Sequence, residues 1–238
     1  FWLKKYVNMF DEIFCLSEVD SSKAYLEKYA PGKVQILSNA ADDVFFESQQ
    51  NKDVLTQYIP EIHSAYFISV ANYREYKNQI DILKEFYQIQ NNQYAMVFIG
   101  SIQTDYYKKL MDVKKKLDSK FGEKEVYCLA GVKRSDIPSI IGGATLYLVG
   151  SKFEEFSISL IECMALGIPF VSTDVGNARI LPGGKTIGDI SEMHTTVMKI
   201  IEDPDLVSRY SQAGRVYTRD KCRISKAVET LENSIMRS

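Results

Sequence analysis

Short apolar runs of strand length alternate along this chain with segments of helical periodicity, and this alternation constrains the fold more than any other feature. Such alternation indicates βαβ units, in which consecutive strands lie parallel. Several runs are apolar at nearly every position, as expected for strands covered by helices on both faces. The sequence therefore predicts an α/β fold with a Rossmann-like parallel sheet. The expected strands are Glu12–Ser17, Lys33–Leu37, Ala65–Val70, Ala95–Gly100, Val126–Ala130, Thr145–Val149, Pro169–Thr173 and a weaker one at Lys185–Ile187.

The segments between these runs carry apolar residues at the spacing of one helix face. In the last of them, Ile224, Val228, Leu231 and Ile235 recur every three or four positions. The expected helices are Ser22–Tyr29, Asn78–Ile89, Asp105–Ser119, Ile158–Leu166, Glu192–Ile201, Pro204–Thr218 and Ile224–Met236.

The stretch from residue 40 to residue 60 differs from its surroundings, because it is polar, has no sustained period and ends at Pro60. We expect a hinge or linker there. The chain is therefore divided into residues 1–48, which belong to a separate unit with the hinge, and a Rossmann-like domain of residues 49–238.

The length and net charge of the chain limit the classes of function that it can have. The 238 residues suffice for one large α/β domain, or for one domain with part of a second. The formal net charge of −2 favours neither a nucleic-acid partner nor a general anionic-membrane surface. No apolar run approaches the ~18 residues that cross a bilayer. The chain begins without Met inside a helix-like pattern, so we expect it to be part of a longer protein.

Cysteine and histidine usage gives no sign of a metal site. The four cysteines are far apart, and no pair has the spacing of metal ligands. We expect reduced cysteines in the core of a cytosolic protein. His63 and His194 stand apart near segment edges, which favours surface positions over catalysis.

Two carboxylates, Glu154 and Glu162, bracket the start of the expected helix over Ile158–Leu166. Glu162 has apolar neighbours, and an ionised carboxylate there is costly unless something accepts its charge. The helix N-terminus beside Glu154 offers unpaired N–H groups to a phosphate. Hydroxyl-binding acids on both sides of a phosphate seat suit a nucleotide sugar. The alternative, a capping Glu and a core Glu held by a structural Lys or Arg, fits the spacing equally well.

Two further loops follow strands at the edge where open α/β sheets bind ligands. Residues 71–78 bring Arg74 and Lys77 to a strand end, which suits a diphosphate, although surface charges on a turn would look the same. Residues 131–136 begin with Gly131, which would let a flat base approach the backbone near Val132.

The motif at 154–169 resembles that of retaining glycosyltransferases of family 4, whose GT-B fold contains two Rossmann domains. Glu154-x7-Glu162 with Phe156 is similar to that family's Glu-x-Phe-Gly-x4-Glu signature, and residues 162–169 resemble its usual continuation.

Two more segments resemble the family in the right order. Asn39-Ala40-Ala41-Asp42 is similar to the Asn-Gly-Val-Asp that closes the first domain, and Lys77-Asn78-Gln79 to the Lys-Asn segment of the second. The resemblance implies that residues 1–48 are the remnant of an acceptor-side domain with the hinge, and that residues 49–238 bind the donor.

The resemblance also implies roles for individual residues. Glu154 would contact donor-sugar hydroxyls, and Glu162 would hold the ribose hydroxyls. Lys77 would stabilise the departing diphosphate, helped by Arg74, since charge builds there as the glycosidic bond breaks. The backbone N–H groups of Phe156, Ser157, Ile158 and Ser159 would meet the distal phosphate and the sugar. Relatives usually need neither metal nor other cofactor, so we expect none.

Several residues depart from the family pattern. Asn72 stands where relatives carry a phosphate-binding Arg, although Arg74 lies two residues later. Ala71 and Ser157 replace glycines, and Ile180 replaces a carboxylate. These changes put the sugar identity in doubt. They also motivate an alternative function, a catalytically degenerate module that acts as a partner-binding or chaperone subunit. A nucleotide-sugar epimerase of the same fold is a third reading, but such enzymes lack the Glu-x7-Glu arrangement.

The expected function is thus transfer of a sugar, with retention, from a nucleotide-sugar donor (UDP-linked) to a glycan or lipid-linked acceptor. We expect this piece alone to bind nucleotide but to transfer sugar weakly or not at all, because the acceptor-side domain is nearly all missing. The family setting implies polysaccharide biosynthesis in the cytoplasm, with peripheral association of the full-length protein at the inner face of the membrane.

Overall fold

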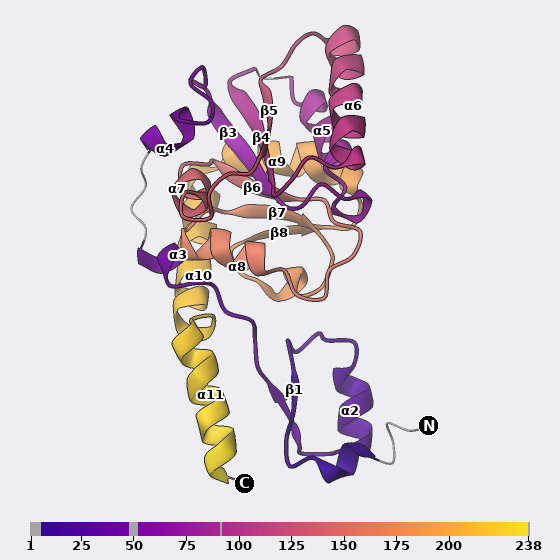
Figure 1. Ribbon diagram of the computed structural model, residues 1–238, viewed down its shortest axis with the longest axis vertical. Helices are drawn as coiled ribbons and strands as arrows, with labels where there is room; N and C mark the ends of the chain where they lie inside the picture. The colour runs from indigo at the N-terminus through magenta and orange to yellow at the C-terminus, as the bar shows by residue number, and fades with distance from the viewer. Residues whose placement is uncertain (1–5, 48–51, 91, 238) are drawn as a thin grey trace.

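A computed structural model describes residues 6–47, 52–90 and 92–237 (Figure 1). Its main body is a six-stranded sheet in which every neighbouring pair of strands is parallel, in the order β5-β4-β3-β6-β7-β8. The α/β, Rossmann-like fold expected from the sequence is confirmed. The strands are β3 (Ala65–Val70), β4 (Tyr94–Gly100), β5 (Val126–Ala130), β6 (Leu146–Val149), β7 (Phe170–Thr173) and β8 (Gly184–Ile187).

The strand order reverses between β3 and β6. From β3 the chain adds β4 and β5 on one side, then returns to place β6, β7 and β8 on the other. The loops that leave β3 and β6 therefore diverge from each other at the carboxyl edge of the sheet. Open α/β sheets bind ligands in the crevice that this divergence creates.

Helices cover both faces of the sheet (Figure 1). Residues of α5 (Gln79–Gln88), α6 (Asp105–Phe121) and α9 (Met193–Ile201) pack in the core on one face. Residues of α7 (Ile137–Gly142) and α8 (Ile158–Ala165) pack in the core on the other. Helix α10 (Pro204–Lys221) contributes Leu206 to the first core and Tyr217 to the second.

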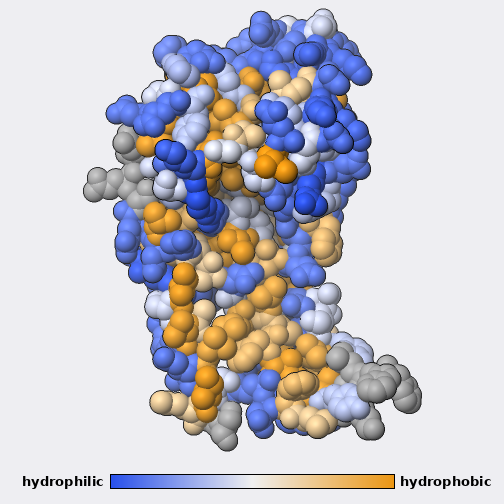
Figure 2. Space-filling model, viewed as in Figure 1, coloured by the Kyte–Doolittle hydropathy of each residue, from blue (hydrophilic) through white to orange (hydrophobic). Residues whose placement is uncertain are grey.

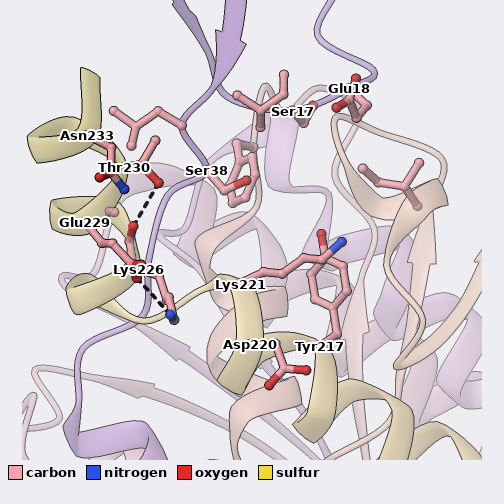
Figure 3. A pocket seen from close by; sticks show the side chains of 15 residues that line it. Ser17, Glu18, Ser38, Tyr217, Asp220, Lys221, Lys226, Glu229, Thr230 and Asn233 are labelled. Atoms are coloured by element: carbon pink, nitrogen blue, oxygen red, sulfur yellow. Dashed lines mark hydrogen bonds and ion pairs between the residues drawn. The ribbon is translucent and has the colours of Figure 1, made fainter. Parts of the chain in front are cut away.

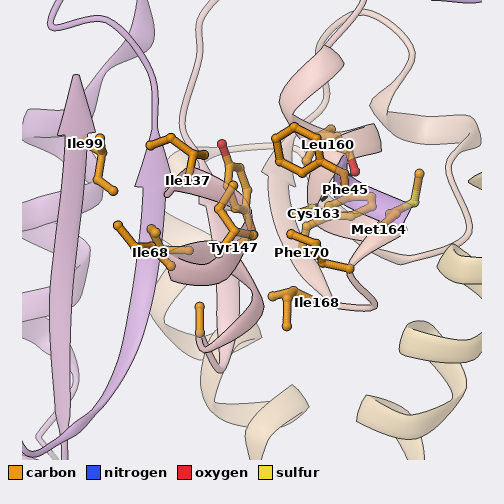
Figure 4. Close-up of a cluster of buried hydrophobic side chains, with 14 of the residues drawn as sticks. Phe45, Ile68, Ile99, Ile137, Tyr147, Leu160, Cys163, Met164, Ile168 and Phe170 are labelled. Atoms are coloured by element: carbon orange, nitrogen blue, oxygen red, sulfur yellow. Dashed lines mark hydrogen bonds between the residues drawn. The ribbon is translucent and has the colours of Figure 1, made fainter. Parts of the chain in front are cut away.

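Successive strand residues alternate between these two cores, which explains the continuous apolar runs. In β3, Phe67 faces the α5 side and Ile68 the α7 side, and both are fully buried. Figure 4 shows the second core, where Tyr147 and Phe170 meet Leu160 and Cys163 of α8. This packing fixes α8, and with it the loop that precedes it.

The N-terminal unit forms a separate two-stranded parallel sheet from β1 (Ile13–Cys15) and β2 (Val34–Ile36), joined by α2 (Lys23–Tyr29). A short 3-10 helix, η1 (Val7–Met9), precedes it. The division at residue 48 falls at residues 48–51, which lie outside the described residues, and stays a prediction.

The stretch around the expected hinge is more ordered than its composition indicates. It contains α3 (Val44–Glu47) and α4 (Lys52–Thr56), two short helices that the sequence did not predict. Phe45 and Leu55 are buried in the core on the sheet face that α7 and α8 cover, the α7-side core. Tertiary contacts therefore stabilise helices that are too short to show a period. The described parts of this stretch are therefore packed on the core, and its role as a hinge or linker stays a prediction.

Helix α11 (Ile224–Arg237) extends from the main body beside the N-terminal unit (Figure 1). The structure confirms the predicted helix, but the apolar side chains of its predicted face are all exposed: Ile224, Val228, Leu231 and Ile235. Figure 2 shows these apolar side chains continuing towards those of the N-terminal unit. None of the helices in residues 6–47, 52–90 and 92–237 combines the length and the apolar character needed to cross a bilayer.

Most remaining differences concern helix ends. Asn78 begins the predicted helix in the sequence but has a left-handed backbone (φ 58°), so α5 starts one residue later. Helix α7 was not predicted, because six residues are too few to show a helical period. The other short elements are η2 (Glu75–Lys77), η3 (Ala178–Ile180) and η4 (Ile190–Glu192). All four cysteines are free, and three are buried.

Candidate functional site

The crevice at the strand-order reversal holds an ion pair between Lys77 and Glu154. Lys77 follows β3 and Glu154 follows β6, so the two loops that diverge there each contribute one charge. Lys77 Nζ lies 2.5 Å from Glu154 Oε1, and both side chains are mostly buried. The backbone N–H of Lys152 also donates to the carbonyl of Tyr76 at 2.8 Å, which ties the two loops together.

The loop after β3 is held by side chains beneath it. The hydroxyl of Tyr73 donates to the carbonyls of Phe98 and Leu129, at the ends of β4 and β5. Gln79 Nε2 donates to the carbonyls of Ala71 and Asn72. These bonds fix the backbone from which Lys77 projects, so its position is set before any ligand arrives.

The loop after β6 is equally constrained. Ser151 Oγ donates to Glu154 Oε1 at 2.8 Å, and Thr173 Oγ1 donates to the Ser151 carbonyl at 2.6 Å. Gly176 (φ +54°) lies against this loop, since a Cβ there would stand 2.8 Å from the Glu155 carbonyl oxygen. The close approach of the two backbones requires glycine at this position.

A cleft of about 610 Å³ opens beside the ion pair. It is lined by Leu16, Asn39, Tyr76, Lys77, Phe153, Glu154, Glu155 and Phe156, and thus lies between the N-terminal unit and the main body. Phe153 and Tyr76 present exposed aromatic rings there. A second cavity of about 500 Å³ shares Phe153, Glu154 and Glu155 and reaches Asp174 and Arg179. A ligand with several hydroxyls and a negatively charged end would find partners for both in this region.

A third cavity, of about 440 Å³, lies between α10, α11 and the N-terminal unit (Figure 3). Its charged side chains include Lys221, Lys226 and Glu229, of which the last two pair at 2.8 Å. The cavity shares Phe156 with the cleft but neither Lys77 nor Glu154 lines it. We therefore place the candidate site at the cleft.

The N-terminus of α8 agrees only in part with expectation. The N–H of Ser157 already donates to Asn177 Oδ1 at 2.9 Å, so it is not free to meet a phosphate as the resemblance implied. Ser157 is buried, and its hydroxyl lies 3.2 Å from that of Ser159. Phe156 lines the cleft, whereas Ile158 is exposed at the first position of α8.

Glu162 lies inside α8, buried as its sequence context predicted, and forms an ion pair with Arg134. Burial raises the pKa of Glu162, and the Arg134 guanidinium opposes that shift. A core Glu held by a basic residue is the arrangement that the alternative interpretation described. Arg134 is nevertheless 62% exposed, so this partner stands at the surface and covers the acid from outside. Glu162 does not line the cleft beside Glu154.

Three other expected site residues do not line the cleft. Arg74 is exposed and does not line the cleft, so its proposed substitution for the absent Arg at position 72 stays a prediction. Asn72 is exposed and accepts a 2.7 Å hydrogen bond from Ser101 Oγ. Val132 packs against the α7-side core at the start of the 131–136 loop.

Sequence reasoning missed Ser151, Asn177 and Arg134 as partners of the site. Arg134 had a usable signal, because a basic residue in a loop at the carboxyl edge of the sheet is placed to meet a buried acid there. Among residues 6–47, 52–90 and 92–237, no group of three or more His, Cys, Asp or Glu side chains could hold a metal ion. Independence from metal stays a prediction.

Comparison with known sequences gives a consistent result. The family model described as "Glycosyl transferases group 1" matches residues 61–217, more than half of the chain. The N-acetyl-alpha-D-glucosaminyl L-malate synthase of Bacillus anthracis is 22% identical over 213 residues, 87% of this chain and 54% of that protein. The alpha-D-kanosaminyltransferase of Streptomyces kanamyceticus is 30% identical over 101 residues, 40% of this chain and 26% of that protein. The chain therefore spans about half or less of these relatives.

Solved structures share the fold. HepE from Anabaena, crystallised with UDP and glucose, superposes with a TM-score of 0.80 at 18% identity, over 98% of this chain and 65% of its own. A glycosyltransferase from Rickettsia africae gives a TM-score of 0.82 at 14% identity, over 98% of this chain and 66% of its own. At such identities the likeness concerns the fold.

Proposed function

The chain belongs to the glycosyl transferase group 1 family, and from that premise we propose that it binds a nucleotide-sugar donor, UDP-linked, for transfer with retention of configuration, as in family 4. The observation that carries the proposal is the Lys77–Glu154 pair at the crevice between β3 and β6. The similarity in fold to a protein crystallised with UDP and glucose supports the choice of nucleotide.

The chemistry follows from the charges of this pair. Transfer breaks the bond between the anomeric carbon and the diphosphate oxygen, and the electron pair stays on the diphosphate. Lys77 would stabilise that charge, with help from the N-terminal dipole of α8. Glu154 would accept hydrogen bonds from donor-sugar hydroxyls in place of the one it now accepts from Lys77. The acceptor oxygen bonds to the anomeric carbon, and its proton passes to the departing diphosphate oxygen.

We propose a glycan or lipid-linked acceptor, used in polysaccharide biosynthesis in the cytoplasm, with peripheral association at the inner face of the membrane. Since the match covers 54% of the Bacillus anthracis relative, we expect a further part of the full-length protein to hold that acceptor. The 238 residues alone should bind nucleotide and transfer sugar weakly.

Thermal denaturation with millimolar UDP, GDP or ADP tests the donor half of the proposal. A nucleotide at about 100 times its Kd adds roughly 2.7 kcal/mol to the free energy of unfolding. For a chain of this size that raises Tm by on the order of 5–10 °C. We expect this rise with UDP, and a much smaller one in Glu162→Gln.

A second candidate function, a partner-binding module without catalysis, is favoured by two observations. Asn72 occupies the position of the expected phosphate-binding Arg, and Arg134 covers the expected ribose-binding acid. An unchanged Tm with all three nucleotides would support this candidate and remove the donor-binding proposal.

A further inference from the structure

Arg134 is held between an acid and an aromatic ring. Its Nη2 donates to Glu162 Oε1, and its Cζ lies 5.0 Å from the centroid of the Phe45 ring in α3. The cation–π contact and the ion pair together restrain the guanidinium group. The 131–136 loop is itself anchored, because the Tyr58 hydroxyl donates to Asp136 Oδ2 at 2.6 Å and accepts from the Lys133 N–H.

The contact leaves half of the carboxylate unused. Within the described residues, no hydrogen bond reaches Glu162 Oε2, yet this atom is not among the fully buried polar atoms that lack a partner. Oε2 is therefore available as an acceptor while Oε1 is occupied. A carboxylate can accept about four hydrogen bonds, so a second donor can bind without displacing Arg134.

We propose that Arg134 is a positioning residue for donor recognition, which holds Glu162 ionised and oriented so that Oε2 accepts from the vicinal hydroxyls of a ribonucleoside diphosphate. This inference rests on the proposed function and extends it to a residue that does not itself touch the ribose. The ligand that it selects is a ribonucleotide rather than a 2′-deoxyribonucleotide, because the deoxy sugar has lost one of the two hydroxyl donors.

The charges and burial around Glu162 explain why it needs Arg134 to stay ionised. Its surroundings in α8 are apolar, and burial favours the neutral acid. Asp42, from the segment before α3, adds a like charge that favours the neutral acid further. Arg134 is the group that opposes both. Without it, the pKa of Glu162 rises further, so the carboxylate is protonated at a higher pH than in wild type.

Calorimetry with UDP and 2′-deoxy-UDP on the full chain tests the inference, at pH 6 and pH 8. The two ligands carry the same phosphates, so the ratio of their Kd values cancels phosphate titration. We expect wild type to prefer UDP on the order of tenfold at both pH values, the worth of one hydrogen bond to a charged group. In Arg134→Gln the preference should be smaller than in wild type, and smaller at pH 6 than at pH 8. Arg134→Lys should retain it at both.

Lys133→Gln is the matched control, since it removes the same charge from the same loop at an exposed side chain, and it should behave as wild type. Arg134→Gln with the wild-type ratio at both pH values would overturn the inference and leave donor binding intact. Tighter UDP binding by Arg134→Gln would also overturn it, because Arg134 would then be a competitor for Glu162. A wild-type chain that binds no nucleotide at all would instead remove the proposed function, and the inference with it.

Discussion

Lys77 Nζ and Glu154 Oε1 lie 2.5 Å apart although 77 residues separate them in the sequence. The contact exists because β3 and β6 are neighbours at the point where the strand order reverses. Each residue follows its strand by a short loop, so the sheet topology brings them together. The pair joins a cation suited to a diphosphate with an acid suited to hydroxyls, and the proposed function depends on this combination.

Removing the cation should reduce turnover more than stability. In the full-length protein, Lys77→Met should lower kcat by on the order of 10²–10³-fold, the usual effect of losing one preorganised group that stabilises transition-state charge. Lys84→Met is the control, because Lys84 forms an exposed pair with Asp81 on α5 away from the crevice. Steady-state kinetics of both variants decide the matter. A Lys77→Met enzyme within threefold of wild type would exclude Lys77 from leaving-group stabilisation.

The two acids should differ in what they bind. Glu162→Gln should weaken UDP binding more than Glu154→Gln, on the order of tenfold, because we assign the ribose to Glu162 and the sugar to Glu154. Glu154→Gln should instead impair transfer in the full-length protein. Calorimetry with UDP gives the first comparison and a transfer assay the second. The reverse order in calorimetry would contradict the assignment.

Gly176 should be essential for the geometry around Glu154. Gly176→Ala places a Cβ 2.8 Å from the Glu155 carbonyl oxygen at φ +54°, and should cost about 2–3 kcal/mol in the free energy of unfolding. Gly32→Ala is the matched control, because Gly32 also has a positive φ but no atom within 4 Å of the added Cβ. It should cost only the backbone strain, about 1–2 kcal/mol. Urea unfolding measures both free energies. Equal losses of stability in the two variants would show that the close approach of Gly176 to Glu155 does not contribute to the cost.

Glu162 should make the folded state less stable at neutral pH than its amide would. Because its pKa is raised above the ordinary value of 4.5, the folded protein binds more protons than the unfolded chain between those two pKa values. The stability of wild type relative to Glu162→Gln should therefore be greatest below pH 4.5 and fall as pH rises through the folded pKa. Thermal unfolding of both proteins across this range provides the measurement. Arg134, left unpaired in the variant, is 62% exposed and is readily hydrated. A variant markedly less stable than wild type at neutral pH would show that the ion pair outweighs the burial of the charge.

The sheet and its covering helices were predictable because their signals are local. Successive strand side chains, such as Phe67 and Ile68, face two different cores. Each strand therefore needs apolar residues on both faces, and this pattern can be recognised within a short segment of sequence. The acids at 154 and 162 were likewise recognised from one continuous motif. Helices α3, α4 and α7 were missed, because elements of four to six residues are too short for a period and are stabilised by contacts with the rest of the fold.

By itself, the sequence determined the α/β class, the strand positions and the identity of the two acids, since each depends on residues close together in the chain. Only the tertiary structure decided which residues those acids and the start of α8 meet. Lys77 pairs with Glu154, Arg134 pairs with Glu162, and Asn177 accepts a hydrogen bond from the N–H of Ser157. These contacts span 77, 28 and 20 residues, and no local pattern specifies them. They follow from the order in which the parallel strands are placed, which brings loops distant in sequence to one edge of the sheet.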